Sequence, residues 1–199
     1  MNDLKTLRDV AGLGTTPAGL RQSALVMIDC QNTYRAGLMQ LEGVEAALDE
    51  AQRVLERARA LGVPVIHIQH DAGPGSPYDV RAEIGQIADK VKPLGSEPVI
   101  VKNYPNSFVQ TELHERLQKL GITNLVLAGF MTHMCVNSTA RGAFNLGYRP
   151  TVVAGATATR ALPSAQGGVV SAAALQEASL ATLSDLFAVI VPRAADLPE

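Results

Sequence analysis

The stretch Ala24-Leu-Val-Met-Ile-Asp-Cys30 indicates the fold class of this chain, because its apolar residues follow one another without alternation. A strand that is apolar on consecutive positions is buried on both faces, as in a parallel sheet covered by helices. Similar short runs, rich in Val, Ile and Leu, recur along the chain and predict further strands. They cover Val63–Gln69, Pro98–Lys102, Asn124–Ala128, Thr151–Ala154 and Phe187–Val191.

Amphipathic segments separate these runs and predict helices. Val44–Leu61 repeats apolar residues at helical spacing and stops at Gly62, a residue typical of helix ends. Ser107-Phe-Val-Gln110 matches a capping box, which predicts a helix from there to Gly121. Two more helices are predicted over residues 133–146 and 168–184. The alternation predicts an α/β fold: an open, doubly wound parallel sheet with helices on both faces.

Length and composition fit a single domain over residues 1–199, in which residues 1–21 form an N-terminal arm. The formal net charge of −2 gives no electrostatic reason to expect nucleic acid or an anionic membrane as partner. No apolar run reaches the length of about 18 residues that a transmembrane helix needs. The absence of an apolar signal core and of a disulfide framework favours a cytoplasmic location.

Reactive side chains gather at the ends of the predicted strands. Asp29 lies near the end of the first strand, Lys102 closes the third, and Cys135 follows the fourth. Ligands bind at the carboxyl ends of strands in open parallel sheets, so we expect these side chains at one edge. Taken singly, Asp29 could cap a turn, Lys102 could be a solvated strand end, and Cys135 an inert core residue. Together they favour a nucleophilic site, because a buried carboxylate needs a partner such as Lys102.

The position of Cys135 at the start of a helix strengthens this hypothesis. Thr132 is predicted as the N-cap, which makes Cys135 the third helical residue. A helix amino terminus and a nearby cation can lower a thiol pKa from about 8.5 to about 3.5–7.5. Cys30 directly follows Asp29 on the same strand, so it should point to the opposite face and serve as a core residue.

The histidines do not form a metal-binding pattern. His67 and His70 are three residues apart on a strand, which sends their side chains to opposite faces. His114 lies on a polar helix and is expected at the surface. His133 is two residues from Cys135, and residues at that spacing on a helix do not face each other. We therefore predict no metal and no cofactor.

Four short motifs occur in order between residues 22 and 192. They are Asp29-Cys-Gln-Asn32 with Tyr34, Lys102-Asn-Tyr-Pro-Asn-Ser-Phe108, Gly129-Phe-Met-Thr-His-Met-Cys-Val136, and Thr139-Ala-Arg141 followed by Gly147-Tyr148. Together they resemble the isochorismatase-like cysteine hydrolases, a superfamily that includes nicotinamidases, N-carbamoylsarcosine amidases and isochorismatases. The Gly-x-x-Thr-x-x-Cys-Val element is the most specific of them.

The resemblance implies a six-stranded parallel sheet and an Asp29–Lys102–Cys135 catalytic triad. It further implies a non-proline cis peptide between Phe130 and Met131, and an oxyanion hole made by the amides of Met131 and Cys135. Relatives are commonly dimers or tetramers, so we expect a homo-oligomer. The substrate pocket is expected to include the side chains of Gln31, Tyr34, Tyr104, Phe108 and His133.

One departure from the family narrows the predicted activity. Nicotinamidases carry a metal-binding Asp-x-His with a further histidine, whereas this region reads His67-Ile-Gln-His-Asp71. This difference argues against a metal and against nicotinamidase activity. Because Cys135 is present, we predict hydrolysis of a small-molecule amide or related carbon–nitrogen bond through a thioester on Cys135. Two alternatives stay open. One is isochorismatase-type vinyl-ether hydrolysis with Asp29 as general acid, and the other is thiol redox chemistry of Cys135 with Cys30.

Overall fold

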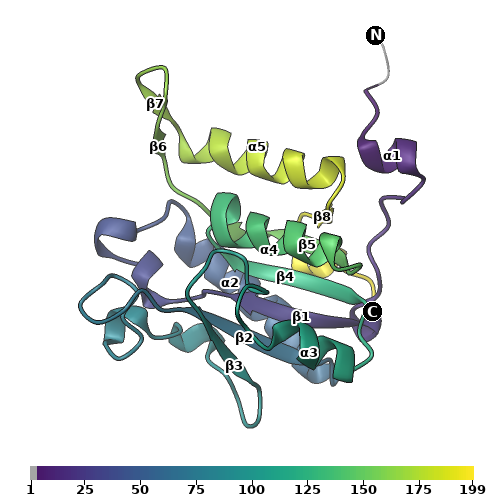
Figure 1. Ribbon diagram of the computed structural model, residues 1–199, viewed down its shortest axis with the longest axis horizontal. Coiled ribbons are helices and arrows are strands. Elements are labelled where there is room, and N and C mark those ends of the chain that lie inside the picture. The colour runs from purple at the N-terminus through teal and green to yellow at the C-terminus, as the bar shows by residue number, and fades with distance from the viewer. Residues whose placement is uncertain (1–3) are drawn as a thin grey trace.

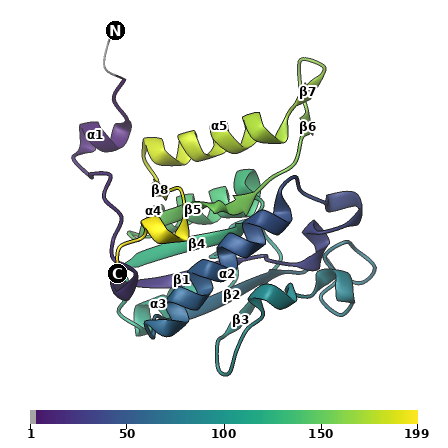
Figure 2. The ribbon, with the colours of Figure 1, turned by 180° about the vertical axis from the view of Figure 1, so that it is seen from behind.

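A computed structural model describes residues 4–199 as a central sheet covered by helices on both faces (Figures 1 and 2). Six parallel strands follow the order β3-β2-β1-β4-β5-β8. Their bounds are β1 Ser23–Ile28, β2 Val65–His70, β3 Val99–Lys102, β4 Asn124–Phe130, β5 Arg149–Ala158 and β8 Val189–Val191. The predicted α/β fold with an open, six-stranded parallel sheet is confirmed.

The helices divide between the two faces of the sheet. Helix α2 (Val44–Ala60) covers one face, and α3 (Leu113–Lys119), α4 (Asn137–Asn145) and α5 (Ala172–Asp185) lie on the other (Figures 1 and 2). Each face has its own cluster of buried apolar side chains. The prediction for α2 is confirmed, and Gly62 after it has the left-handed φ of 66° that favours glycine.

Strand β1 shows why consecutive apolar residues suit the centre of this sheet. All six of its residues are buried. Leu25 and Met27 pack into the core on the α2 side, whereas Val26 and Ile28 pack into the core on the α3 and α4 side. Successive side chains of a strand point to opposite faces of the sheet. A strand that is covered on both faces therefore needs apolar residues at odd and at even positions.

The strand order places a switch point between β1 and β4. The chain runs outward through β1, β2 and β3, then returns to lay β4 against the other side of β1. At the end of this pair, Gly129 lies beside Ile28 with a φ of 122°. A Cβ at Gly129 would lie 1.9 Å from the Ile28 carbonyl oxygen, so only glycine allows this approach. Such a switch point opens a crevice at the carboxyl ends of the strands.

The capping box predicted at Ser107 is wrong. Helix α3 begins at Leu113, and residues 103–112 form turns. The Ser107 side chain is paired with Thr139 on α4, with the two hydroxyl oxygens 2.8 Å apart. Gln110 has a left-handed φ of 56°, which a helix cannot accommodate. A tertiary contact has therefore replaced the local cap.

Other boundaries also differ from the prediction. Helix α5 begins at Ala172 and not at 168, because β7 (Val169–Val170) pairs antiparallel with β6 (Leu162–Pro163) in a separate hairpin. Strand β5 is longer than predicted and ends at Ala158. The connection over residues 71–98 contains two short 3-10 helices, Glu83–Gly85 and Asp89–Val91.

The described part of the N-terminal arm begins at residue 4, so residues 1–3 of the predicted arm lie outside it. Helix α1 (Leu7–Ala11) docks near the end of α5 (Figure 1). The Leu7 amide donates to Asp185 Oδ1 at 2.9 Å, and Arg8 Nη1 donates to the Leu186 carbonyl at 2.8 Å. Throughout residues 4–199, no helix is both long and apolar enough to cross a membrane.

Candidate active site

The three side chains predicted to meet do so at the carboxyl edge of the sheet. Lys102 Nζ lies 2.7 Å from Asp29 Oδ2, and both side chains are fully buried. The same ammonium donates a hydrogen bond to Cys135 Sγ at 3.4 Å. The Asp29 oxygens accept no well-aligned hydrogen bond within the described residues, so a carboxylate lone pair is left for a proton. Lys102 thus bridges a carboxylate and a sulfur.

Asp29 owes its position to the backbone just after β1. Its φ is 49°, which is uncommon for a residue other than glycine but tolerated by Asp. Two main-chain hydrogen bonds hold this conformation: the Asp29 amide donates to Ile68 at 3.0 Å, and the Gln31 amide donates to Asp29 at 2.8 Å. The strained residue is therefore fixed by its neighbours, as is common at functional sites.

Cys135 lies near the start of a helix, but Thr132 is not its N-cap. The helix begins with a wide π turn over Thr132–Val136, with Met131 in the cap position and no side-chain cap, and continues as α4. The Thr132 hydroxyl is buried and has no hydrogen-bond partner among the described residues. The cis peptide between Phe130 and Met131, expected from the resemblance, is present.

The predicted fall in the thiol pKa is wrong. Burial, and then the Asp29 carboxylate, raise the pKa of Cys135 to about 12, against the opposing effect of Lys102. Burial likewise raises the pKa of Asp29, although Lys102 lowers it. The start of the helix and the Lys102 ammonium favour the thiolate, but their effect on the pKa of Cys135 is smaller than that of burial and of the Asp29 carboxylate. Burial therefore favours the neutral thiol, from which a thiolate forms by proton transfer.

Gln31 fixes the end of β2 next to the triad. Its Nε2 donates to the carbonyls of His70 at 3.0 Å and Gly85 at 2.7 Å, and its Oε1 accepts from the His70 amide at 2.9 Å. The side chain is fully buried. Gln31 therefore determines where His70 lies and ties the connection over residues 71–98 to the site.

His70 is a further residue of the site, although its position was not predicted. His70 is the last residue of β2 and pairs in register with Lys102 on β3. Its Nδ1 lies 3.3 Å from Lys102 Nζ, within hydrogen-bonding distance of the ammonium. Burial and the Lys102 charge lower the pKa of His70, which favours the neutral ring that can accept this bond. The strand-end rule that selected Lys102 would also have selected His70.

Arg160 was also missed, because β5 was predicted to end four residues too early. It follows the carboxyl end of β5. Burial raises the pKa of Tyr78 and lowers that of His133, and the Arg160 charge is a smaller influence that lowers both. Arg160 Nε is buried without a hydrogen-bond partner among the described residues. His133 is half-buried and shares a hydrogen bond of 2.5 Å with Thr159. A cation with a free donor therefore lies among these side chains.

The predicted aromatic pocket residues have different surroundings. Tyr34 is buried against Phe130, with ring centroids 5.7 Å apart, and burial followed by the charges of Asp29 and Cys135 raises its pKa. Tyr104 is 44% exposed. Phe108 stacks on Tyr148 with centroids 5.7 Å apart, and within residues 4–199 it makes no ring contact with the triad. Tyr34 therefore lies near the triad, whereas Tyr104 and Phe108 stay predicted pocket residues.

No cluster of three or more His, Cys, Asp or Glu side chains suited to a metal occurs within residues 4–199. His67 pairs with Glu97 at 3.0 Å, on the side of the sheet away from His70. His114 is half-buried and shares a 2.8 Å hydrogen bond with the Tyr148 hydroxyl, so it is less exposed than predicted. Cys30 packs in the core beneath α2, in the layer opposite to Cys135.

The arrangement has counterparts in known proteins. Residues 23–195 match the isochorismatase domain family. The chain belongs to the isochorismatase family. The structure of an isochorismatase from Pseudomonas putida superposes on this family member with a TM-score of 0.94 at 38% identity, covering 98% of this chain and 100% of that one.

Two curated members of the family illustrate its range. A secreted isochorismatase effector of Verticillium dahliae is 32% identical over 94% of this chain and 97% of its own length. A ureidoacrylate amidohydrolase of Pseudomonas syringae is 30% identical over 78% of this chain and 80% of its own length. The first of these relatives is named as secreted. The cytoplasmic location and the homo-oligomeric state of this chain stay predictions.

Proposed function

We propose that this isochorismatase-family hydrolase cleaves a small-molecule amide or related carbon–nitrogen bond through a thioester on Cys135. One observation carries the proposal: the Lys102 ammonium lies 3.4 Å from the Cys135 sulfur and 2.7 Å from the Asp29 carboxylate, so three groups from distant parts of the chain meet at one edge of the sheet. A nucleophile, a base and a group that stabilises charge are the parts that covalent acyl transfer requires.

In the first step, Asp29 takes the thiol proton as Cys135 Sγ attacks the substrate carbonyl carbon. The raised thiol pKa makes this transfer necessary, because only the thiolate is a strong nucleophile. Lys102, at 2.7 Å from Asp29 and 3.4 Å from the sulfur, stabilises the negative charge as it moves between them. Asp29 is therefore the general base.

The carbonyl oxygen becomes negatively charged in the tetrahedral intermediate and needs donors. The Met131 amide makes no main-chain hydrogen bond within residues 4–199. Cys135 is the fourth residue of its helix, and the first four amides of a helix have no acceptor in an earlier turn. These two amides are the proposed oxyanion hole.

Collapse of the intermediate breaks the carbon–nitrogen bond, and the amine leaves with the proton that Asp29 had taken. Water then attacks the thioester while Asp29 removes one of its protons. The second intermediate expels the sulfur, which regains a proton from Asp29. One carboxyl group thus serves as base and then as acid in each half of the reaction.

Arg160 supports a substrate class for this reaction. Its Nε has no partner among the described residues, and its charge acts on Tyr78 and His133 beside the triad. A guanidinium without a counter-ion favours a negatively charged ligand group. We propose that the amide substrate carries an anionic group that binds Arg160.

The test compares two cysteines of the same chain. Cys135→Ala should lower hydrolysis of a substrate found in an amide library by at least about a thousandfold, because the nucleophile is removed. Cys30→Ala, in the opposite core layer, should leave turnover within a small factor of the parent rate. Ammonia or amine release measures activity, and circular dichroism verifies the fold. Undiminished turnover by Cys135→Ala would exclude the thioester route.

The raised pKa of Asp29 supports a second candidate, vinyl-ether hydrolysis with Asp29 as general acid. A carboxyl group that keeps its proton to higher pH is a better proton donor near neutrality. This reaction needs no sulfur nucleophile. Under this candidate Cys135→Ala keeps most activity and Asp29→Asn loses it, so the two variants together distinguish the candidates.

A further inference from the structure

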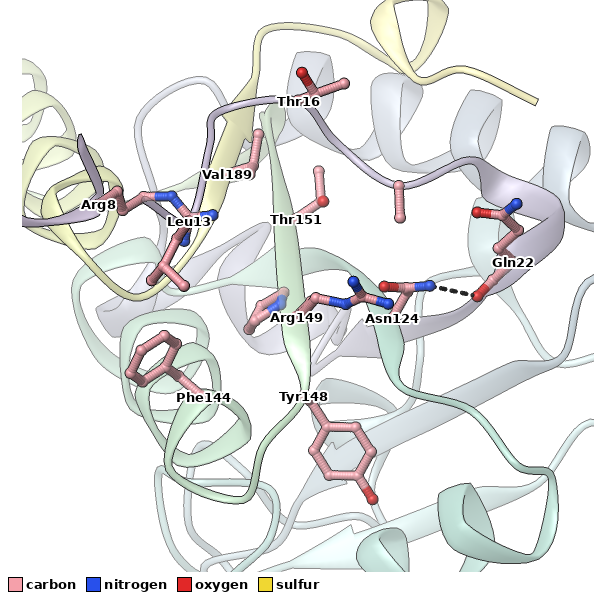
Figure 3. Close-up of a pocket in the computed structure, with 12 residues that line it drawn as sticks. Arg8, Leu13, Thr16, Gln22, Asn124, Phe144, Tyr148, Arg149, Thr151 and Val189 are labelled. Carbon is pink, nitrogen blue, oxygen red and sulfur yellow. Dashed lines mark hydrogen bonds between the residues drawn. The ribbon is translucent and has the colours of Figure 1, made fainter. Parts of the chain in front are cut away.

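A cavity lies at the amino edge of the sheet, opposite the triad. Figure 3 shows the N-terminal arm passing over the beginnings of the strands, with side chains of both directed into the space between them. The cavity has a volume of about 280 Å³. We call it the amino-edge cavity, and its lining includes Arg8, Leu13, Asn124, Phe144, Arg149 and Thr151.

Two guanidinium groups line this cavity without a carboxylate. Arg8 is buried, and its Nε and Nη1 donate to the carbonyls of Gly14 at 3.0 Å and Leu186 at 2.8 Å. Arg149 is exposed and lies at the start of β5. Neither forms an ion pair within residues 4–199, and no Asp or Glu lines the cavity. Two like charges facing one space favour an anion there.

A third group in the cavity, the side-chain oxygen of Asn124, lacks a hydrogen-bond donor. Asn124 is 6% exposed, and its Nδ2 donates to the Gln22 carbonyl at 3.0 Å. That bond orients the amide, because a carbonyl can only accept. The Asn124 Oδ1 is left buried with no donor among the described residues. Since an unpaired buried acceptor is costly, the site calls for a hydrogen-bond donor.

The lining also includes apolar side chains from both sides of the cavity. Leu13 lies on the arm, and Phe144 lies on α4 (Figure 3). A bare inorganic anion would leave these surfaces unfilled. An organic ligand with an apolar body would cover them while its charged end meets the guanidinium groups.

We propose that the amino-edge cavity is a second ligand site, which binds a small organic carboxylate that also carries a hydroxyl or amide donor. The carboxylate accepts from Arg149 and Arg8, the donor bonds to Asn124 Oδ1, and the apolar body packs on Leu13 and Phe144. Strand β4 begins in this site and ends near the triad. At the usual rise per residue of a strand, its two ends lie about 20 Å apart. The site is therefore separate from the proposed catalytic one.

The experiment uses 4-hydroxybenzoate as probe and titration calorimetry on the full chain. Binding of 4-hydroxybenzoate is expected, with 4-hydroxybenzamide, which lacks the charge, at least about tenfold weaker. Benzoate, which lacks the donor, and inorganic phosphate, which lacks the apolar body, should both bind less tightly. Phosphate binding as strong as that of 4-hydroxybenzoate would overturn the assignment of an organic carboxylate.

Variants locate the bound probe. Arg149→Gln should weaken binding about tenfold or more, and Arg149→Lys should recover part of it, because charge is restored without the planar fork. Arg21→Gln, a matched change at an exposed arginine outside the cavity, should leave the affinity unchanged. Arg160→Gln should also leave it unchanged. Three results would each overturn the proposal. They are an unchanged affinity for 4-hydroxybenzoate in Arg149→Gln, a loss of that affinity in Arg160→Gln, and no binding of 4-hydroxybenzoate at millimolar concentration.

Discussion

The two edges of the sheet differ in how their charged side chains are paired. At the carboxyl edge, the fully buried Lys102 and Asp29 lie 2.7 Å apart and compensate each other. At the amino edge, Arg8 and Arg149 line one cavity and neither has a carboxylate partner within residues 4–199. The difference agrees with the two sites proposed above: one whose charges serve proton transfer, and one whose arginines bind an anionic ligand.

The contrast has an energetic basis. Two charges lose their hydration when they are buried, and an ion pair recovers this only with close geometry. Removing one member of such a pair leaves an uncompensated charge in a medium of low polarity. An exposed guanidinium such as Arg149 keeps its water, so its removal costs little.

Lys102→Met should lower the free energy of unfolding by about 3–5 kcal/mol, because it leaves Asp29 buried without a counter-ion. Arg149→Gln should change it by no more than about 0.5 kcal/mol. Urea unfolding followed by circular dichroism measures both. Similar decreases in the free energy of unfolding for the two variants would contradict the contrast between a paired charge at the carboxyl edge and an unpaired one at the amino edge.

His70→Leu should lower turnover about tenfold, because Lys102 loses an acceptor at 3.3 Å that holds its ammonium. His70→Asn should recover part of the rate, since its carbonyl oxygen can occupy the place of Nδ1. In the parent protein, protonation of His70 removes the acceptor and adds a charge beside Lys102. Turnover should therefore fall as pH decreases below the usual histidine pKa of 6.5, because the pKa of His70 is lowered.

The pH profile separates positioning from packing. His70→Asn cannot protonate in this range, so its profile should lack the acidic decline that His70 causes. A purely structural role for His70 would lower turnover at all pH values without changing the shape of the profile. Identical profiles for the two proteins would contradict the proposed contact with Lys102.

Replacing Glu97 should give the smallest of these changes. Glu97 also allows a comparison between an ion-paired residue at the amino edge and the two unpaired arginines there. It pairs with Arg59 at 2.7 Å, unlike the arginines of the amino-edge cavity. Burial opposes ionisation of Glu97, but Arg59, the Leu94 amide and His67 outweigh it and lower its pKa from 4.5 to about 2. A lowered carboxyl pKa stabilises the fold above the unfolded value, and this contribution is lost as pH falls from 4.5 towards about 2.

Glu97→Gln should therefore reduce the free energy of unfolding by about 1 kcal/mol at pH 7, with less effect near pH 2. Urea unfolding at both pH values measures the difference between variant and parent. A loss of the same size at both values would indicate that Glu97 acts through its shape and not through its charge.

The sequence predicted the framework because the framework depends on local burial. Runs such as Ala24–Cys30 are apolar at every position, and this pattern is retained wherever both faces of a strand are covered. Strand-end side chains share one edge in any parallel sheet, so Asp29, Lys102 and Cys135 could be grouped before their distances were known. The resemblance to the family added the cis peptide at Phe130.

Boundaries failed where distant residues compete with local signals. Ser107 matches a capping box, but its hydroxyl pairs with Thr139 on α4. Strand β5 extends to Ala158 because its final residues pair with the end of β4, and the early predicted end concealed Arg160. Neither contact can be read from residues adjacent in the chain.

By itself, the sequence determined the layered α/β fold and the three residues of the proposed catalytic site, since both follow from strand patterns and strand ends. Only the tertiary structure decided the state of Cys135, whose pKa rises to about 12 through burial and Asp29. It also decided that His70 contacts Lys102 and that two arginines share one cavity. The reason is physical: a pKa or a pocket depends on the groups that surround it in space, and those come from distant parts of the chain.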